Sequence, residues 1–348
     1  MKLIVQIPCY NEAGTLAEAV ADIPRAIPGI DQVEILIVDD GSSDTTSEVA
    51  RKLGVDHIIR HRRNKGLART FHRGLEECLR LGADIVVNTD GDNQYSGADI
   101  AKLVEPILNE DVDIVVGDRG GLENPHFSPF KRYLQVLGSA GIQKATGLEI
   151  TDAVSGFRAI SRDAAQQINI VSDFSYTIEM LIQASAKRIS VMSVPIRTNS
   201  KTRESRLFSS IPQFLRMSAT TLLRMYTMYR PLRVFSILGL VMVAAGLIPI
   251  LRFGYFYYLG DGGGHLQSLV LGGMLFSMGI VTMLCGILAD LINFNRKLME
   301  KMLLRMERFE QTGEKSSDQL NTDPRERFSQ DQLKWELDEL TGFMREAG

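Results

Sequence analysis

Two long stretches in the last third of the chain contain no charged residue. They are the 18 residues from Val234 to Leu251 and the 24 residues from Leu266 to Ala289. A helix needs about 20 predominantly apolar residues to cross a bilayer, and uncharged runs of this length are uncommon in soluble cores. We therefore predict a two-helix transmembrane anchor over residues 234–292, the alternative being a pair of buried core helices.

The residues around these runs predict their orientation. Arginine and lysine precede the first run and follow the second, whereas the short connection between the runs carries few basic residues. Aromatic residues crowd the stretch from Phe253 to Tyr258, where the first span would meet the far membrane interface. Basic residues favour the cytoplasmic side and aromatic residues favour the interfaces. We predict a two-span protein of the cell (inner) membrane with both termini in the cytoplasm.

The part of the chain before the spans alternates short apolar runs with polar segments of helical length. The apolar runs are 3–7, 33–38, 85–87 and 114–116. Strands that alternate with helices form a mostly parallel sheet covered on both faces. We predict a Rossmann-like α/β domain over residues 1–210. The polar clusters that follow the four runs should converge, because such sheets bind ligands at the carboxyl ends of their strands.

Two further segments flank the predicted spans. Residues 211–233 mix apolar side chains with Arg216 and Arg224, which predicts interfacial amphipathic helices in the headgroup layer. Residues 293–348 carry apolar side chains at helical spacing, which predicts a helical cytoplasmic tail. The lipid bilayer is thus an expected partner, and the transmembrane and tail helices could join copies of the chain in a homo-oligomer.

Charge and cysteine content narrow the functional classes. The formal net charge of −3 gives no overall attraction for nucleic acid, so we expect no nucleic-acid partner. The three cysteines, Cys9, Cys78 and Cys285, have neither the spacing of a zinc site nor an even count for a disulfide framework. This pattern indicates a reducing compartment for the N-terminal domain.

The triplet Asp90-Gly91-Asp92 follows the third apolar run, where a strand should end. Alternate residues of an extended segment point to the same side, so the two carboxylates should share one face. Two neighbouring carboxylates favour a bound cation. Oxygen ligands with open positions suit Mg²⁺ or Mn²⁺ together with substrate phosphates, and Gln94 could add an amide oxygen. The alternative for the triplet alone is a polar surface turn.

A second acidic pair, Asp39-Asp40, closes the second apolar run. Ser43 or Asp44 could cap the helix that follows, so part of the polarity in this segment is structural. We expect one of the two aspartates to remain free to accept hydrogen bonds from a base or ribose, as an acidic residue after a strand does in nucleotide-binding folds.

Six motifs occur in an order that resembles glycosyltransferase family 2 of the GT-A fold, and within it the dolichol- and polyprenyl-phosphate hexosyltransferases. The resemblance covers roughly residues 3–235. The motifs are Pro8-Cys9-Tyr10-Asn11-Glu12, Val38-Asp39-Asp40-Gly41-Ser42-Ser43-Asp44, Asn64-Lys65-Gly66-Leu67-Ala68, Asp90-Gly91-Asp92-Asn93-Gln94, Asp152-Ala153-Val154-Ser155-Gly156-Phe157-Arg158 and Glu204-Ser205-Arg206-Leu207.

The resemblance implies roles for the strand-end residues on the donor side. It implies Mg²⁺ or Mn²⁺ as the cofactor and a nucleotide-sugar donor as a partner. The nucleotide would be bound by Pro8, Tyr10, Glu12, Asp39, Asp40, Lys65, Asp90 and Gly91. The metal would be held by Asp90, Asp92 and Gln94, and Asp92 is one of the expected catalytic residues.

The resemblance also implies a basic site for a lipid phosphate. The expected ligands of that phosphate are Arg119, Lys131, Arg132, Arg203 and Arg206, of which Arg119 and Arg132 are also expected catalytic residues. Arginine suits this role because its guanidinium can contact two phosphate oxygens. The motif usually written Gly-Glu-Ser-Lys reads Arg203-Glu204-Ser205-Arg206 here, so a glycine is replaced while positive charge is kept. Each cation has an alternative as a solvated surface charge.

A lipid monophosphate near neutral pH is largely ionised and needs no strong base. We therefore predict inverting transfer of a hexose from a UDP- or GDP-sugar to undecaprenyl or dolichyl phosphate, the expected acceptor partner, at the cytoplasmic face. Asp152 is expected to orient the sugar or acceptor, with a turn cap as its alternative. Two other functions stay open: transfer to a hydroxyl of a glycolipid or polysaccharide, with Asp152 as the base, and a degenerate membrane scaffold.

Overall fold

The structure is a computed structural model that describes residues 1–120, 129–171, 176–199, 220, 223–224, 226–260 and 263–320. Of residues 129–137, 297, 300–301 and 303–320 it describes the backbone alone. The chain forms two compact units, Met1–Asp290 and Leu291–Gly348. The described part of the second unit, residues 291–320, is helical.

A seven-stranded sheet organises the N-terminal part, in the order β3-β2-β1-β4-β6-β5-β7. Every pairing is parallel except those that β6 makes with β4 and β5. The mostly parallel sheet is therefore as predicted. The strands are β1 (Lys2–Cys9), β2 (Gln32–Asp39), β3 (His57–Arg60), β4 (Ile85–Asn88), β5 (Ile114–Asp118), β6 (Arg158–Ser161) and β7 (Val191–Pro195).

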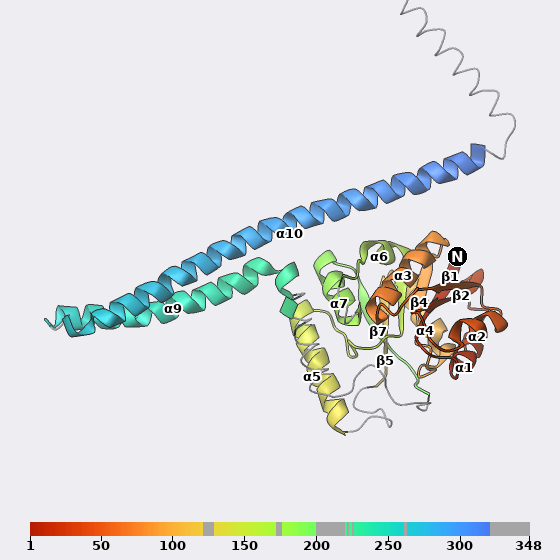
Figure 1. The fold of residues 1–348 in the computed structure, drawn as a ribbon, viewed down its shortest axis with the longest axis horizontal. Helices are drawn as coiled ribbons and strands as arrows, with labels where there is room; N and C mark the ends of the chain where they lie inside the picture. Colours follow the sequence, from red (N-terminus) through yellow and green to blue (C-terminus); the bar gives the residue numbers. More distant parts are fainter. Residues whose placement is uncertain are drawn as a thin grey trace, which may run out of the picture. The chain divides into compact units, whose positions relative to one another are not determined.

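Helices cover both faces of this sheet (Figure 1). Along β1, Ile4 packs into one buried cluster with residues of α3, α6 and α7, whereas its neighbours Leu3 and Val5 pack into another with residues of α1 and α4. This division follows from the two-residue period of a strand. The helices are α1 (Leu16–Ala21), α2 (Thr46–Lys52), α3 (Leu67–Arg80), α4 (Ile100–Asn109), α5 (Pro129–Thr146), α6 (Arg162–Gln167) and α7 (Tyr176–Lys187).

The four strands predicted from apolar runs are confirmed as β1, β2, β4 and β5. The other three strands, β3, β6 and β7, were not predicted. β3 is half-buried and ends at an exposed arginine, and β6 has only two apolar residues in its four. Strands with so few buried apolar residues give no clear periodic signal in the sequence.

The two uncharged runs form helices, α9 (Pro231–Tyr258) and the start of α10 (Leu266–Leu320). Each is long and apolar enough to cross a membrane, and only 11% of the most apolar window of each is buried. Large apolar side chains such as Leu240, Ile248 and Leu284 are exposed. The alternative of two buried core helices is therefore wrong, and the helices indicate a membrane protein.

Glycines bring α9 and α10 into close contact. A Cβ atom added to Gly239 would lie 2.7 Å from the carbonyl oxygen of Gly279, and one added to Gly246 would lie 2.8 Å from that of Gly272. The two glycines on each helix are seven residues apart. Seven residues make about two helical turns, so both glycines lie on the side of the helix that faces its partner. Small residues at such contacts let helix backbones approach, as in membrane helix pairs.

The chain enters α9 directly from the core of the N-terminal part. Tyr229 is buried in the cluster that contains α3 and α7, and Met228 packs against the same cluster. Arg230 alone separates Tyr229 from Pro231, the first residue of α9. The predicted interfacial segment 211–233 is otherwise largely outside the described residues.

Candidate active site

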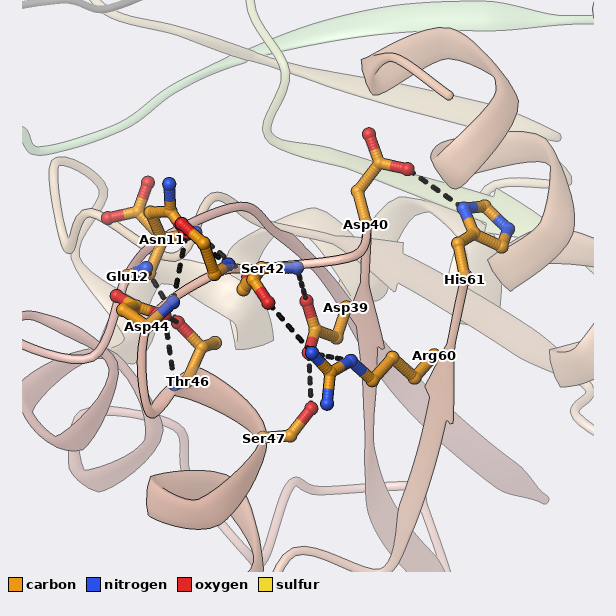
Figure 2. Close-up of polar contacts among 11 residues, drawn as sticks. Asn11, Glu12, Asp39, Asp40, Ser42, Asp44, Thr46, Ser47, Arg60 and His61 are labelled. Atoms are coloured by element: carbon orange, nitrogen blue, oxygen red, sulfur yellow. Dashed lines mark hydrogen bonds and ion pairs between the residues drawn. The ribbon is translucent and has the colours of Figure 1, made fainter. Parts of the chain in front are cut away.

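The carboxyl end of β2 is occupied by two buried aspartates whose carboxylates hold the adjacent loops (Figure 2). The carboxylate of Asp39 accepts hydrogen bonds from the backbone N–H of Ser42, at 2.8 Å, and from the hydroxyl of Ser47. It also pairs with Nε of Arg60 at 3.3 Å. Asp39 thereby fixes the turn between β2 and α2.

Asp40 holds the loop that follows β3. Its carboxylate accepts the backbone N–H groups of Lys65 and Gly66, both at 2.8 Å, and lies 2.9 Å from Nδ1 of His61. Both carboxylates are thus engaged by the protein itself, and the expected hydrogen bond from one of them to a base or ribose stays a prediction. Both carboxylates are buried, and a buried carboxylate is stable only when hydrogen bonds replace its water.

The turn after β1 is built around Asn11, which has a left-handed backbone with a φ of 57°. Its side-chain oxygen accepts the N–H of Ser43 at 2.8 Å, and its own N–H donates to the hydroxyl of Ser42 at 2.9 Å. These bonds join the first two predicted motifs, as Figure 2 shows. The turn leaves Tyr10 exposed and Glu12 buried, whereas Pro8 is buried within β1.

The Asp90-Gly91-Asp92 loop packs against this turn. A Cβ atom added to Gly91 would lie 3.1 Å from Sγ of Cys9 and 3.3 Å from Cγ of Glu12. The hydroxyl of Thr15 lies 2.8 Å from the carbonyl oxygen of Gly91 and 3.0 Å from Oε2 of Glu12. The structure therefore brings Glu12 together with the predicted metal loop, and glycine at position 91 permits that approach.

Asp90, Asp92 and Gln94 are half-buried at the carboxyl end of β4. The N–H of Gln94 donates to Oδ1 of Asp92 at 3.3 Å. Among the residues that the structure describes, no group of three or more His, Cys, Asp or Glu side chains gathers. Two carboxylates and one amide nevertheless fit Mg²⁺ or Mn²⁺, because these ions bind nucleotides through one or two carboxylates plus the phosphates themselves.

A turn before β6 lies beside Asp90. Both carboxylate oxygens of Asp90 lie 3.3 Å from where a Cβ atom would sit on Gly156. The N–H of Gly156 donates to the phenol oxygen of Tyr95 at 3.1 Å, and Nδ2 of Asn88 donates to its carbonyl at 2.8 Å. Burial raises the pKa of Tyr95 to about 12, so its phenol is neutral. The sequence reasoning missed Tyr95 and Asn88.

The partly exposed Arg119 forms an ion pair with the fully buried Asp152. Nε and Nη2 of Arg119 lie 2.6 and 2.9 Å from the two oxygens of Asp152, whose side chain is fully buried. Burial opposes the charge of Arg119, but the charge and hydrogen bonds of the Asp152 carboxylate raise its pKa above the ordinary value. A turn cap alone does not describe the role of Asp152, because its carboxylate also holds the guanidinium of Arg119.

A fully buried arginine, Arg158, supports the loop that carries Asp152. Arg158 donates to the carbonyl oxygens of Ala153, Ser155 and Thr177 at 2.8–2.9 Å. Burial lowers its pKa to about 10. Arg158 thereby ties the loop of Ala153 and Ser155 to Thr177 at the start of α7, which helps to set the position of Asp152.

The remaining predicted site residues are placed less completely. The side chain of Lys65 is exposed. Lys131 and Arg132 lie in α5, where only the backbone is described, and Arg203 and Arg206 lie outside the described residues. The donor-side residues are thus brought to one edge of the sheet, and the positions of the acceptor-side cations other than Arg119 stay predictions.

Comparisons with known proteins agree with this architecture. The family described as "Glycosyl transferase family 2" matches residues 4–168. A UDP-N-acetylglucosamine–dolichyl-phosphate N-acetylglucosaminyltransferase of Methanococcus voltae is 30% identical over 55% of this chain and 83% of its own length. A dolichol-phosphate mannosyltransferase of Pyrococcus furiosus is 34% identical, and the match covers 60% of this chain and 59% of that protein.

Among solved structures, a glucosyl-3-phosphoglycerate synthase from Mycobacterium tuberculosis, in complex with Mn²⁺, UDP-glucose and phosphoglyceric acid, has a TM-score of 0.50. The sequences are 20% identical, and the match covers 66% of this chain and 79% of the other. This likeness concerns the fold, and it confirms the predicted GT-A architecture. Because the family match covers the strands that carry the candidate site, and one relative shares 30% identity across most of its own length, the chain belongs to glycosyl transferase family 2 and is a glycosyltransferase.

Proposed function

We propose that this enzyme transfers a hexose from a UDP- or GDP-sugar to a polyprenyl phosphate, undecaprenyl or dolichyl, at the cytoplasmic face of the cell membrane. The observation that carries the proposal is the loop of Asp90, Asp92 and Gln94 at the strand ends of a chain that continues into two apolar, exposed helices. Relatives named as dolichyl-phosphate sugar transferases support the same acceptor class.

On the donor side, Asp90, Asp92 and Gln94 would hold Mg²⁺ or Mn²⁺. The ion would supply positive charge to the diphosphate as the sugar departs. Tyr10 exposes its ring beside the buried Glu12, an arrangement suited to stacking on a base. Pro8, Lys65 and Gly91 would complete the nucleotide site, while Asp39 and Asp40 contribute by fixing its loops.

On the acceptor side, the lipid phosphate would be held by Arg119 with Lys131, Arg132, Arg203 and Arg206. One oxygen of the phosphate attacks the anomeric carbon, and the bond from that carbon to the diphosphate breaks with its electron pair on the nucleotide. Attack opposite the leaving group inverts the anomeric centre. No proton has to be removed, because the phosphate is already ionised.

The contacts of Asp152 favour this phosphate acceptor over a hydroxyl. A hydroxyl acceptor needs a general base within hydrogen-bond reach. Both carboxylate oxygens of Asp152 are engaged by Arg119 and the side chain is fully buried. Asp152 is therefore suited to orienting Arg119, which in turn would face the acceptor phosphate.

The proposal is tested with the purified full-length chain in lipid nanodiscs. Radiolabelled UDP- and GDP-sugars are supplied with Mn²⁺ and either undecaprenyl or dolichyl phosphate, and the lipid is extracted. We expect labelled lipid whose sugar is released by mild acid, as a glycosyl phosphate is. Asp92→Asn should abolish this labelling. Lipid label that resists mild acid would indicate a hydroxyl acceptor, and no label with any donor would refute the proposal.

A further inference from the structure

The segment that follows β7 forms a short antiparallel ribbon with the end of the candidate metal loop. Tyr95 and Thr198 pair as an isolated antiparallel bridge. On either side of that bridge, the N–H of Asn199 donates to the carbonyl of Gln94 at 2.9 Å, and the N–H of Ser96 donates to that of Arg197 at 3.3 Å. Residues more than 100 positions apart are thereby held in register next to the site.

Asn199 adds its side chain to this ribbon. Its Nδ2 donates to the carbonyl oxygen of Asn93 at 3.1 Å and lies 3.4 Å from the carbonyl oxygen of Tyr95. Asn93 has a left-handed backbone, with a φ of 55°. Asparagine tolerates that conformation better than most residues, but it is still less favourable than an ordinary turn. The Asn199 amide therefore stabilises the uncommon conformation on which the loop depends.

The residue held in this way lies between two of the candidate metal ligands. Asp92 precedes Asn93 and Gln94 follows it, so the backbone angles of Asn93 set the relative directions of both side chains. A metal site requires its ligands to be held close to the productive geometry by neighbouring hydrogen bonds. The bond from Asn199 to the carbonyl of Asn93 meets this requirement from outside the loop.

The ribbon is itself anchored at its other end. The N–H of Arg197 donates to Oδ2 of Asp99 at 2.7 Å, and its Nη2 donates to Oδ1 at 2.9 Å. The Asp99 side chain is fully buried. The N–H of Ile196 donates to the carbonyl of Asp118, the residue before Arg119, at 2.9 Å. The position of Asn199 is therefore set by the sheet and by α4.

We propose that Asn199 is a positioning residue for the metal site: its side-chain amide holds Asn93 in the left-handed conformation that directs Asp92 and Gln94 toward one cation. The inference rests on the proposed function only in placing the cation on those side chains. The sequence analysis did not single out Asn199.

The test measures metal binding directly on the full-length chain in nanodiscs. Free Mn²⁺ is followed by electron paramagnetic resonance as protein is added, with UDP or GDP present, whichever the parent binds more tightly. Asn199→Asp preserves the size of the side chain but places an oxygen against the Asn93 carbonyl, and Asn199→Ala removes the amide. Both should weaken Mn²⁺ binding roughly tenfold, the lower end of the effect of removing a residue that orients metal ligands.

Ser190→Ala is the matched control. Ser190 lies just before β7, and its hydroxyl is bonded to the backbone and side chain of Asp113, away from the metal loop. Its removal should lower the unfolding temperature about as much as Asn199→Ala while leaving Mn²⁺ binding unchanged. Unaltered Mn²⁺ binding in both Asn199 variants, or equal weakening in Ser190→Ala, would overturn the proposal.

The two proposals fail separately. A parent enzyme that binds Mn²⁺ and nucleotide but labels no lipid would refute the proposed acceptor and leave the role of Asn199 to be decided by the binding comparison. A parent enzyme that binds no Mn²⁺ with either nucleotide would overturn the role of Asn199.

Discussion

Arg119 and Asp152 are bound to each other through two hydrogen bonds, from Nε and Nη2 to the two carboxylate oxygens, although 33 positions separate them in the chain. Arg119 follows β5 directly, and Asp152 lies in the turn that Arg158 holds in place. The charge of Arg119 is thus fixed at the carboxyl end of the sheet, on the same edge as Asp90. A cation fixed at this edge is the feature that an anionic acceptor requires.

The first prediction concerns this pair. Asp152→Asn should lower the free energy of unfolding by about 3 kcal/mol, because it leaves the charge of Arg119, whose side chain is only 16% exposed, without its counter-charge. Asp56→Asn is the control, since Asp56 pairs with an exposed Arg25 and should cost about 1 kcal/mol or less. Thermal unfolding followed by circular dichroism checks both variants. Equal losses would contradict the prediction.

The same variant also tests the chemistry assigned to Asp152. At a temperature where Asp152→Asn remains folded, we expect a raised KM for the lipid phosphate and a pH dependence of kcat that keeps its shape. If Asp152 were a general base, its removal would abolish kcat and eliminate the limb of the pH profile that reports the base. Steady-state transfer assays between pH 5.5 and 8.5, in roughly half-unit steps, distinguish these outcomes.

Gly41 provides a second prediction. It has a φ of +70°, and a Cβ atom there would lie 2.6 Å from the carbonyl carbon of Arg63. Gly41→Ala should therefore cost about 3 kcal/mol and raise the KM for the donor, because it displaces the loop that Asp40 holds. Gly54→Ala is the matched control: its φ is +65° but nothing lies within 4 Å of the added Cβ. Its cost should be about 1 kcal/mol, from the backbone conformation alone.

The third prediction concerns acid stability. Burial alone would raise the pKa of Asp99, but hydrogen bonds from Arg197 and the charge of Lys102 lower it below the ordinary value. A lowered folded-state pKa contributes stability above the unfolded value of about 3.9, and that stability is lost as the pH falls through the folded value. Asp99→Asn should therefore destabilise the protein at pH 7 and show a shrinking difference from the parent below about pH 4. A difference independent of pH in urea unfolding would contradict this origin.

The fourth prediction concerns the α9–α10 contact. Gly279→Leu should separate the helices, because a Cβ atom there would lie 2.8 Å from both the carbonyl oxygen of Gly239 and the N of Val243. The readout is oxidative cross-linking of a Met242→Cys/Thr282→Cys pair, in a chain that also carries Cys285→Ser. The side chains at these two positions contact each other across the helix pair, since the hydroxyl of Thr282 lies 3.8 Å from Sδ of Met242.

Gly273→Leu is the control for this experiment, because nothing lies within 4 Å of its added Cβ. We expect cross-linking to fall several-fold with Gly279→Leu and to persist with Gly273→Leu. Loss of cross-linking in both variants would show that added bulk anywhere on α10 disturbs the hairpin, and would contradict a glycine-specific contact.

The sequence predicted those elements of the fold that contain a run of apolar residues long enough to indicate a strand or a helix. β1 and β2 contain runs of buried apolar residues, and α9 is apolar on every side. β6 and β7 could not be found in this way. β6 has only two apolar residues in its four, β7 is only half-buried, and both pair with strands that are distant in sequence.

The candidate site shows the same division. The Asp90-Gly91-Asp92 loop was expected at a strand end because it follows an apolar run, and it lies there. Asp39 and Asp40 hold the neighbouring loops through contacts that form only in the folded chain. Asp39 pairs with Arg60, and Asp40 contacts His61 and the N–H of Lys65. Asn199 lies 106 positions from Asn93, and no local pattern could have joined the two.

The burial of Tyr229 limits how the enzyme can meet its acceptor. Two residues of extended chain reach at most about 7 Å, so the catalytic domain cannot move far from the point where α9 begins. In a bilayer, this short tether would confine the enzyme's search for an anchored acceptor to two dimensions, while the nucleotide sugar still arrives from solution. The collision rate would then depend on how densely the acceptor populates the membrane surface rather than on its amount per volume of cell.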